Sequence, residues 1–580
     1  MNSMMLMLLS FVGYIIAYRT YGQFLSRKVF GLNVKAVVPA NRFEDGQDYV
    51  PTKKGVIFGH HYASIAGTGP IVGPAIGIIW GWVPAFLWVF LGSIIMGGVH
   101  DLGSLILSMR HQGKSISEIT ARYINRRTRL LFFLIVFFEL LLVVAVFGLV
   151  IAVIFSMFPQ SVFPIWCEIP IAVFLGYMVY NKKGNVTVFT ALAVILMYIT
   201  VVAGHFLPLK MPALGHMPAT GVWTVILLIY AYIASILPVT TLLQPRDYIN
   251  AWELFVAMGL LIAGILVAGA QGKIPMVAPA FNLHPENAPS LWPFLFITIA
   301  CGAISGFHSL VSSGTTAKQV SSELDAQFVG YGSMLLESIL SLLVIIACGA
   351  GLGMAYTAGN GSLLTGFAAW QAHYGNWAGA SGLSANINAF VIGSANMMTT
   401  FGLPRAIAII IMGVFVASFA GTTLDTATRI QRYVISELAS DFHLNFLKGR
   451  WTATALAVIT AFLLAFATGP DGKGALTLWP LFGAVNQLLA GLALIVLTIY
   501  LRRKGPYYWV ALIPCIFMMV MTLWGMIMNL RDYFSGGNWC LVIIGSLCFL
   551  LAIWMCWEAF LAFVRPSFLP KEEGVTWQPE

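Results

Sequence analysis

The chain has 580 residues, of which 59% are hydrophobic and only 9% are charged, and its mean hydropathy is +0.86. Soluble globular proteins carry about 25% charged residues, so this composition excludes a soluble protein and indicates one that crosses a membrane many times. The net charge of +9 then reports topology rather than nucleic-acid binding. The seven cysteines contain no Cys-x-x-Cys pair, and we expect neither a disulfide framework nor a metal cluster.

Apolar segments long enough to cross a hydrocarbon core of about 30 Å recur from end to end. The first lacks a basic start and a small-residue cleavage site, so it is interpreted as a retained helix rather than a signal peptide. The stretch 357–402 is expected to hold a re-entrant or surface helix around Asn388–Met398. We predict fifteen spans, at 4–24, 56–80, 82–109, 130–157, 164–181, 185–207, 220–243, 250–270, 291–315, 327–356, 403–427, 451–468, 475–501, 507–529 and 540–563.

Basic residues predict the orientation of these spans. When alternate loops are assigned to opposite sides, one side holds 26 of the 31 lysines and arginines and the other side holds the remaining five. Cytoplasmic loops collect lysine and arginine, so the N-terminus is expected outside and the C-terminus in the cytoplasm.

The polar stretches are too short to form a soluble domain with its own core. We expect an N-terminal helix with a basic cytoplasmic loop in 1–55 and a transport core in 56–428, with broken helices near 66–70 and 236–246. Further helices are expected in 429–580.

The second span contains "GHHYASIAGTGPIVGPAIG", residues 59–77, which is rich in residues that interrupt helices. Pro70 removes a backbone donor and disfavours helix at Gly69. Irregular backbone is excluded from lipid unless it is wrapped in protein or lines a wet cavity, and transporters use such breaks to bind substrates and ions. Close packing through small residues is the alternative, but it leaves the prolines and histidines unexplained. Substrate-binding candidates here are Ser64, Gly67, Thr68 and Gly69.

The segment "YIASILPVTTLLQPRDYIN", residues 232–250, is expected to be a second interrupted span because Pro238 lies in its middle. If the second span is the first helix of an inverted repeat, this span is the sixth, and the two run in opposite directions as a five-plus-five repeat requires. The fold class is therefore an all-α polytopic membrane protein of 14 to 16 spans with a LeuT-like core. Pro238 and Thr240 join the substrate-binding candidates.

The ninth span, "CGAISGFHSLVSSGTTAKQ", residues 301–319, is dense in hydroxyl groups and becomes the eighth helix of such a core. In that architecture the eighth helix pairs hydroxyls with freed carbonyls of the first helix to hold an ion, although serine also bonds within its own helix. The expected ion-site residues are Ala66, Gly69, Ser309, Ser312 and Ser313, with Ser312 and Ser313 facing residues 66–69.

Ionisable groups inside a membrane are costly and usually functional. His308 lies among small residues in the middle of its span and is a further substrate-binding candidate. His100 and Asp101 point about 100° apart on a helix and are not expected to pair with each other, so Asp101 is expected to find a basic partner elsewhere. Asp425 and Arg429 are spaced for an i,i+4 ion pair that acts as a structural clamp. The gating candidates are His60, His61, Asp101, Arg246, Asp247, Lys318, Asp425 and Arg429.

The sequence contains no Walker A, Gly-x-Ser-x-Gly or His-Glu-x-x-His motif, so we expect no enzyme and no cofactor. Transport energy must then come from an ion gradient. A histidine set without His-x-His or His-x-x-x-His spacing gives only weak support for a metal site, and none is expected.

Several long blocks resemble the carbon starvation protein A family: "FGHHYASIAGTGPIVGPAIG", "GWVPAFLWVFLGSIIMGGVHDLGSLILSMRH", "QPRDYIN", "SGFHSLVSSGTTAKQ" and "SFAGTTLDTATRIQRY". They cover about residues 55 to 435. The resemblance implies the amino acid–polyamine–organocation superfamily, the LeuT fold and a place in the bacterial inner membrane. Members are described as peptide uptake systems of carbon starvation, and close relatives as proton-driven pyruvate symporters.

Either substrate presents a carboxylate, which suits the half-helix N-terminus near Thr68 and Gly69, helped by Arg246 or Lys318 if either reaches the cavity. The interior offers few uncommitted acids for a peptide amine, so we favour proton-coupled uptake of a small carboxylate such as pyruvate, with peptide uptake as the alternative and a passive channel as a third reading. Protons are favoured over sodium because histidines titrate near neutral pH.

Overall fold

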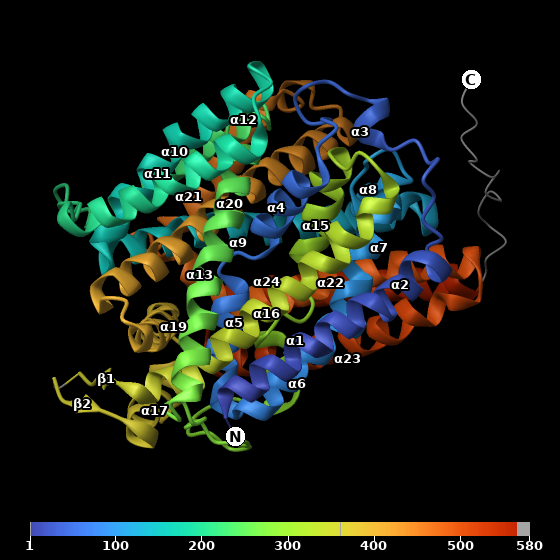
Figure 1. Ribbon diagram of the computed structural model, residues 1–580. Coiled ribbons are helices and arrows are strands. Elements are labelled where there is room, and N and C mark those ends of the chain that lie inside the picture. The colour runs from blue at the N-terminus through green and yellow to red at the C-terminus, as the bar shows by residue number, and fades with distance from the viewer. Residues whose placement is uncertain (1, 360, 565–580) are drawn as a thin grey trace.

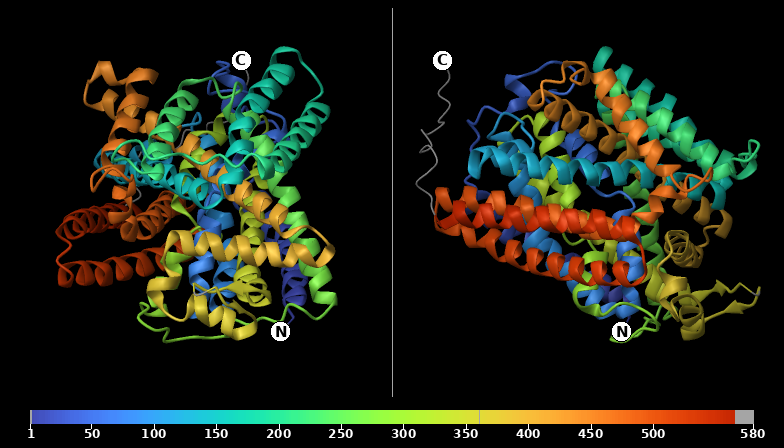
Figure 2. Two further views of the ribbon diagram at one scale, coloured as in Figure 1. Left: turned by 90° about the vertical axis from the view of Figure 1, so that its left-hand side faces the viewer. Right: turned by 180° about the vertical axis from the view of Figure 1, so that it is seen from behind.

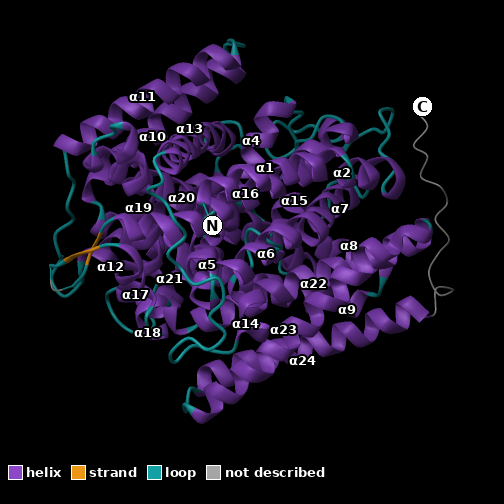
Figure 3. Cartoon of the chain, turned by 60° about the horizontal axis from the view of Figure 1, so that its bottom comes forward, coloured by secondary structure: helices purple, strands orange, loops and turns teal. Residues whose placement is uncertain are grey.

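The apolar segments of the sequence form helices in a computed structural model that describes residues 2–359 and 361–564. Figure 3 shows one small pair of strands beside the helices. The first half of the chain forms α1 (Ser3–Arg19), α2 (Tyr21–Phe24), α3 (Pro39–Arg42), α4 (Lys54–Ile65), α5 (Gly69–Gly77), α6 (Trp82–Gly92), α7 (Gly98–Met109), α8 (Ile116–Tyr123), α9 (Arg126–Met157), α10 (Val162–Gly176), α11 (Val186–Phe206) and α12 (Ala219–Ile236).

The second half of the chain contains further helices and two short strands. It forms α13 (Leu243–Ala270), α14 (Leu291–Thr298), α15 (Gly306–Gly314), α16 (Ser333–Ile346), β1 (Tyr356–Thr357), β2 (Leu363–Leu364), α17 (Gly366–Tyr374), α18 (Trp377–Ala380), α19 (Leu383–Met398), α20 (Arg405–Asp441), α21 (Arg450–Ala465), α22 (Trp479–Lys504), α23 (Trp509–Ser535) and α24 (Trp539–Val564). The strands β1 and β2 are antiparallel, with Tyr356 opposite Leu364.

The helices are arranged around a buried centre. In the apolar 18-residue stretch of each helix, 100% of the residues of α22 and 89% of those of α20 are buried. The corresponding shares for α11 and α24 are only 22% and 28%. The pair α23 and α24 runs along one outer side of the bundle, and α10 and α11 along another (Figures 1 and 2). The apolar outer faces of these peripheral helices are suited to lipid.

The expected all-α polytopic class is confirmed. Among the described residues, twelve helices are long and apolar enough to cross a membrane, and the bent pair α4–α5 raises the number to thirteen. The other two of the fifteen predicted spans correspond to the 16-residue α21 and to the two short helices α14 and α15. The helix predicted around Asn388–Met398 is α19, which packs against α5, α13 and α20 and is largely buried rather than on the surface.

The break predicted in the second span lies between α4, which ends at Ile65, and α5, which begins at Gly69, and the two helices are bent by 47°. The alternative explanation for the glycines, close packing against neighbouring segments, is supported as well. A Cβ added to Gly67 would lie 2.2 Å from Thr423 Oγ1, and one added to Gly69 would lie 2.4 Å from Cys301 Sγ. The glycines therefore serve both the break and the close approach of neighbouring segments.

The prediction of a broken span in residues 232–250 is wrong. Residues 237–242 connect α12 to α13, which are two separate candidate spans. Pro238 ends a helix here instead of interrupting one, because the chain reverses direction directly after it. The prediction placed the second break two spans too early.

The second broken segment lies in the predicted ninth span, which was expected to be continuous. Helix α14 ends at Thr298 and α15 begins at Gly306. Gly302 lies between them with a φ of +88°, a conformation that glycine adopts without steric cost. Its added Cβ would also lie 2.0 Å from Ser341 Oγ, so the position has no room for a side chain.

Side chains satisfy the backbone groups that the second break frees. Trp88 Nε1 donates to Ile299 O at 2.8 Å, and Gln487 Nε2 donates to Phe296 O at 3.0 Å. Asn486 Oδ1 accepts from Phe307 N at 2.9 Å. Just after the first break, Ser341 Oγ donates to Pro70 O at 3.1 Å, a carbonyl of α5 that has no helical donor because residue 74 is a proline. Irregular backbone is tolerated in the bundle because protein groups replace the missing helical partners.

Candidate functional site

A cavity of about 620 Å³, which we call the vestibule, reaches both helix breaks. Gly69 and Gly73 of α5 form one wall, and Thr298 and Cys301 of the second break form the other. Trp377 also lines it, and the ends of α22 and α23 complete it. Its polar lining is contributed by Asn287, Thr298, Cys301, Ser381, Asn529, Asp532 and Tyr533.

A fully buried cluster of charged residues lies beside the second break. His308 Nδ1 on α15 is 2.9 Å from Asp101 Oδ2 on α7, and His308 Nε2 is 3.3 Å from Glu337 Oε2 on α16. We call these three residues the buried triad. Gly302 N donates to Glu337 Oε1 at 3.1 Å, which ties the triad to the break itself.

The prediction that Asp101 finds a basic partner elsewhere agrees with its contact to His308. The prediction that it does not pair with His100 is wrong, because His100 Nδ1 lies 2.7 Å from Asp101 Oδ1. The carboxylate is short and Nδ1 is the ring nitrogen closest to the backbone, so an angular separation of about 100° still lets the two atoms meet.

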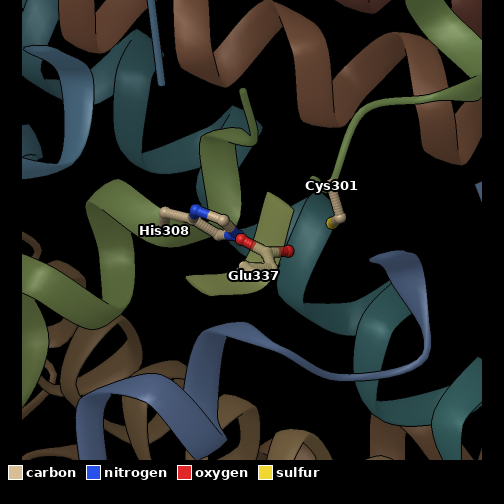
Figure 4. Close-up of side chains that lie close together, drawn as sticks. All are labelled: Cys301, His308 and Glu337. Atoms are coloured by element: carbon tan, nitrogen blue, oxygen red, sulfur yellow. The ribbon is translucent and has the colours of Figure 1, made fainter. Parts of the chain in front are cut away.

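Cys301 lies next to this triad and was not predicted as a site residue. One ligand atom from each of Cys301, His308 and Glu337 lies within 4.8 Å of the other two (Figure 4). His308 Nε2 and Glu337 Oε2 have no hydrogen-bond partner among the described residues, although they face each other. The Cys301 thiol donates to Ser305 Oγ at 3.3 Å.

A second buried histidine pair lies on α4, before the first break. His60 Nδ1 is 2.5 Å from Asp247 Oδ2 on α13, and Ser64 Oγ is 3.4 Å from the same oxygen. Asp247 Oδ1 has no partner in the described chain. His61 Nδ1 contacts Thr316 Oγ1 at 2.8 Å. Both histidines are fully buried within the protein.

Arg246 lies in a third buried cluster, between two carboxylates. Its Nε is 2.9 Å from Glu168 Oε1 on α10, and its Nη1 is 2.5 Å from Asp425 Oδ2 on α20. Tyr230 OH donates to Asp425 Oδ2 at 2.7 Å. With both carboxylates bound, Arg246 is committed to holding α10, α13 and α20 together and does not line the vestibule.

The predicted i,i+4 pair of Asp425 and Arg429 is wrong. Arg429 Nη1 lies 3.1 Å from Asp48 Oδ1, and Arg429 Nη2 donates to Leu237 O at 2.6 Å. Asp425 instead contacts Arg246 on another helix. Tertiary partners outcompete the local one because they satisfy several donors of each buried guanidinium at once, whereas an i,i+4 pair supplies one contact.

Asp48 belongs to a segment that ties several elements together, residues 45–52, which we call the strap. Asp48 accepts from Tyr433 OH at 2.6 Å and lies 3.3 Å from Arg432 Nη2. Val50 N donates to Lys318 O, Thr52 N donates to Gln319 O, and Val239 N donates to Gln47 O. Burial opposes ionisation of Asp48, but Arg429, Arg432 and Lys318 outweigh it and hold its pKa below the usual range.

The remaining predicted residues are only partly gathered at the vestibule. Gly69 lines it, and Ala66, Gly67 and Thr68 form the buried break beside it. Pro238 and Thr240 lie in the α12–α13 connection beside the strap, and Lys318 Nζ lies 4.0 Å from the centre of the Tyr433 ring. None of these three lines the vestibule.

The predicted hydroxyl ligands have different surroundings. Ser309 Oγ donates to Gly306 O at 2.7 Å, within its own helix. Ser313 Oγ donates to Ser309 O at 2.7 Å and accepts from Ile116 N at 3.3 Å, so it faces α8 rather than residues 66–69. Ser312 Oγ is buried without a partner among the described residues.

The sequence contained a signal for one of the missed residues. Glu168 is an acid inside an apolar span and meets the rule that intramembrane ionisable groups are functional candidates. Cys301 and Asp48 carried no comparable signal, because a cysteine in an apolar span and an aspartate in a polar loop are both ordinary.

A many-span helical bundle with two broken helices beside a cavity, and with paired charges buried in its core, is the architecture of a membrane transporter. The model of a family described as carbon starvation protein CstA matches residues 2–525. The chain therefore belongs to this family.

Related proteins carry two kinds of name. "Peptide transporter CstA" of Campylobacter jejuni is 34% identical over 573 residues, covering 90% of this chain and 80% of the relative. "Pyruvate/proton symporter BtsT" of Escherichia coli K12 is 31% identical over 573 residues, covering 88% and 80%. The solved structure of MhsT in complex with L-phenylalanine aligns with a TM-score of 0.45 at 12% identity, over 88% of this chain and 99% of that one.

The Arg246 cluster makes a testable prediction about pairing. In a double-mutant cycle, Arg246→Met and Asp425→Asn should couple by about 1–3 kcal/mol in the free energy of unfolding, because Arg246→Met leaves the Asp425 carboxylate buried without its cation, and Asp425→Asn leaves Arg246 with only the carboxylate of Glu168. Arg429→Met and Asp425→Asn should be nearly additive, within about 0.5 kcal/mol. Unfolding of the purified protein in detergent provides the measurement. Stronger coupling of Asp425 to Arg429 than to Arg246 would contradict the assignment.

Asp48 makes a prediction about pH. A carboxylate whose folded-state pKa is lowered stabilises the protein above its unfolded pKa and loses this contribution as the pH falls through the folded-state value. Asp48→Asn should therefore cost about 2 kcal/mol at pH 7, and the difference from wild type should shrink below about pH 4. Thermal unfolding at both pH values tests it.

A matched control for Asp48 is Asp325→Asn. Asp325 pairs with Lys54 at 3.4 Å, and the Lys54 side chain is 52% exposed. Such a surface pair contributes about 0–1 kcal/mol, so this variant should change little at either pH. An equal effect of both substitutions would show that the strap is not held by Asp48.

Proposed function

We propose that the protein is a secondary active transporter that takes up a small carboxylate such as pyruvate, driven by protons, across the bacterial inner membrane. The observation that carries the proposal is the vestibule, because it reaches both broken helices. It is lined by Gly69 at the start of α5 and by Cys301 in the non-helical segment between α14 and α15. The names of the relatives, a peptide transporter and a pyruvate/proton symporter, support transport of a small carboxylate-bearing substrate.

The substrate carboxylate is placed at the start of α5. This helix begins at Gly69, which lines the vestibule, and Thr68 before it gives no side-chain cap. The first-turn N–H groups of a helix and the positive end of its dipole attract anions. Arg246 is excluded as the recognising cation, since Glu168 and Asp425 already bind it.

A peptide is the second candidate substrate, because two features of the vestibule suit a longer molecule. Its volume of about 620 Å³ exceeds what pyruvate needs, and Asp532 in its wall offers a carboxylate to an amine. Side-by-side uptake of pyruvate and small peptides distinguishes the two substrates. A passive channel is disfavoured because the strap ties α20, the α12–α13 connection and residues 318–320 together.

The helix contacts support a five-plus-five inverted repeat in which α14–α15, rather than α12, is the sixth element. Helix α13 packs against α4 and α22 packs against α15, while α7 packs against α15 and α16 packs against α5. Likewise α12 packs on α9, α21 packs on α20, and α9 packs on α20. These contacts match in pairs under one correspondence between the two halves. In it, α4–α5 corresponds to α14–α15, α6–α7 to α16, α9 to α20, α12 to α21, and α13 to α22. The hairpin α10–α11 is then an insertion.

This correspondence keeps the orientation expected from the basic residues, because an inserted hairpin adds two spans and leaves the direction of later helices unchanged. The N-terminus is then outside and the C-terminus in the cytoplasm. The strap, which lies in the basic segment 19–54, is placed at the cytoplasmic end, and the vestibule opens at the other end. This arrangement corresponds to an outward-facing state.

The coupling proton is assigned to His60 and Asp247. Their atoms are 2.5 Å apart across α4 and α13 and fully buried, and His60 lies in the last turns of α4, which ends at Ile65. A proton gained or lost there changes the charge between the two helices, which alters the stability of their contact. The ionisable groups in electrostatic reach of this pair are His61 on α4, Arg246 on α13, Glu168 on α10 and Asp425 on α20.

Gly69→Leu should reduce uptake to background while leaving insertion largely intact, because its side chain would fill the floor of the vestibule. Uptake of labelled pyruvate into proteoliposomes, with matched protein amounts, measures the effect. Gly259→Leu is the control, since nothing lies within 4 Å of a Cβ added at Gly259 on the exposed side of α13. Restored uptake in Gly69→Leu combined with Cys301→Gly, which removes both atoms that a Cβ at Gly69 would approach, would trace the loss to packing alone.

Proton coupling predicts that a protonophore abolishes uptake and that replacing sodium by choline does not. His60→Gln should remove the dependence on the proton gradient while retaining exchange of labelled for unlabelled substrate, because exchange needs no net proton movement. His205→Gln, at the exposed end of α11, serves as the control. Strict dependence on sodium would overturn the choice of ion.

A further inference from the structure

The cluster of Cys301, His308 and Glu337 has a geometry that transport of a carboxylate does not explain. Two of its three ligand atoms, His308 Nε2 and Glu337 Oε2, are buried without a hydrogen-bond partner in the described chain. The side chains come from the second break, from α15 and from α16, and Figure 4 shows Cys301 and His308 on opposite sides of Glu337. The geometry points to a binding site for a borderline-soft divalent cation of the Zn²⁺ class.

The spacing of the two buried atoms fits a metal better than a hydrogen bond. His308 Nε2 and Glu337 Oε2 are 3.3 Å apart and are not aligned for a hydrogen bond. Zinc binds nitrogen and oxygen at about 2.0–2.2 Å in tetrahedral sites, which puts neighbouring ligands about 3.3–3.6 Å apart. The cysteine sulfur is within 4.8 Å of both, and a thiolate ligand lies about 2.3 Å from zinc. A rotation of the Cys301 side chain completes three ligands.

Asp101 supplies the outer contact that metal-binding histidines commonly have. His308 Nδ1 lies 2.9 Å from Asp101 Oδ2, so the proton of a neutral ring belongs on Nδ1 and the lone pair of Nε2 faces Glu337 and Cys301. A carboxylate in this position fixes the orientation of the ring and raises the basicity of the ligating nitrogen. Asp101 is itself held by His100 at 2.7 Å.

The charges of the cluster also favour a cation. Asp101 and Glu337 are two fully buried carboxylates, and no arginine or lysine contacts either of them in residues 2–359 and 361–564. Buried carboxylates need compensation. A divalent ion bound by Glu337 and by the thiolate of Cys301 supplies it, and the thiol proton leaves to solvent as the sulfur–metal bond forms.

The vestibule gives the ion an entry path and a fourth ligand. Cys301 is half-buried and lines the vestibule wall, so the cluster adjoins solvent-accessible space. Three protein ligands of mixed sulfur, nitrogen and oxygen type leave a fourth position for water. This donor set excludes Mg²⁺ and Ca²⁺, which require oxygen ligands, and favours zinc, cobalt and related ions.

Cobalt(II) provides a direct spectroscopic test on the purified full-length protein. We expect one equivalent of Co²⁺ to bind and to produce a thiolate-to-cobalt charge-transfer band in the near ultraviolet, and Zn²⁺ to displace it. Cys301→Ser should abolish the band. His308→Gln and Glu337→Gln should weaken binding by about tenfold or more, and Asp101→Asn by about 10–100-fold.

Two controls match the test variants. Cys167→Ser removes a half-buried cysteine of α10, and Glu139→Gln removes the charge of a fully buried, unpartnered glutamate of α9; both should leave the band unchanged. If a ligand variant fails to fold, protection of the wild-type Cys301 thiol answers the same question, because Zn²⁺ should slow its alkylation by N-ethylmaleimide.

Absence of a stoichiometric Co²⁺ band in the wild type, or a band that survives Cys301→Ser, would overturn the site. This outcome leaves the proposed transport function untouched, because the spectroscopic test measures no uptake.

Discussion

Backbone groups inside a membrane protein must find partners within the protein, and the rest of this structure depends on how two broken helices meet that requirement. Side chains of other helices bind the groups that the second break frees, including Trp88 and Glu337, and Ser341 binds the carbonyl of Pro70 that Pro74 leaves without a donor in α5. Those helices are thereby fixed around the breaks. The same irregular backbone leaves the start of α5 and the thiol of Cys301 facing a cavity, so the interruption that costs helical hydrogen bonds also creates the space for a ligand.

The buried charged groups also find their partners on other helices. Each cluster joins helices that are far apart in the sequence: α4 to α13 through His60 and Asp247, and α10, α13 and α20 through Arg246. Removing one partner of a buried pair is far more costly than an exposed pair is stabilising. Each pair therefore fixes the contact between the helices that contribute it. The strap, held by Asp48, adds a comparable set of contacts at one end, while the vestibule is open at the other.

Sequence reasoning predicted the kinds of residues at the site better than their partners. The break at residues 66–70 and the choice of His308 and Asp101 as candidates, which lie in contact with each other, followed from helix-breaking residues and ionisable groups in apolar spans. The second break was placed near Pro238, because proline is a strong local signal, whereas the true break at 299–305 is built on Gly302 and contains no proline. Asp425 was paired with Arg429 because helical spacing is visible in the sequence, while the distant partners Arg246 and Asp48 are not.

By itself the sequence determined that the chain is a many-span helical membrane protein with one helix broken at residues 66–70, because hydropathy, length and the sites of glycine and proline are local properties. Only the tertiary structure decided which buried charges meet, where the second break lies, and that Cys301, His308 and Glu337 converge beside the vestibule. The reason is that each buried group takes the partner that best satisfies it in three dimensions. In a bundle of this size, that partner usually comes from another helix, whose position no local pattern records.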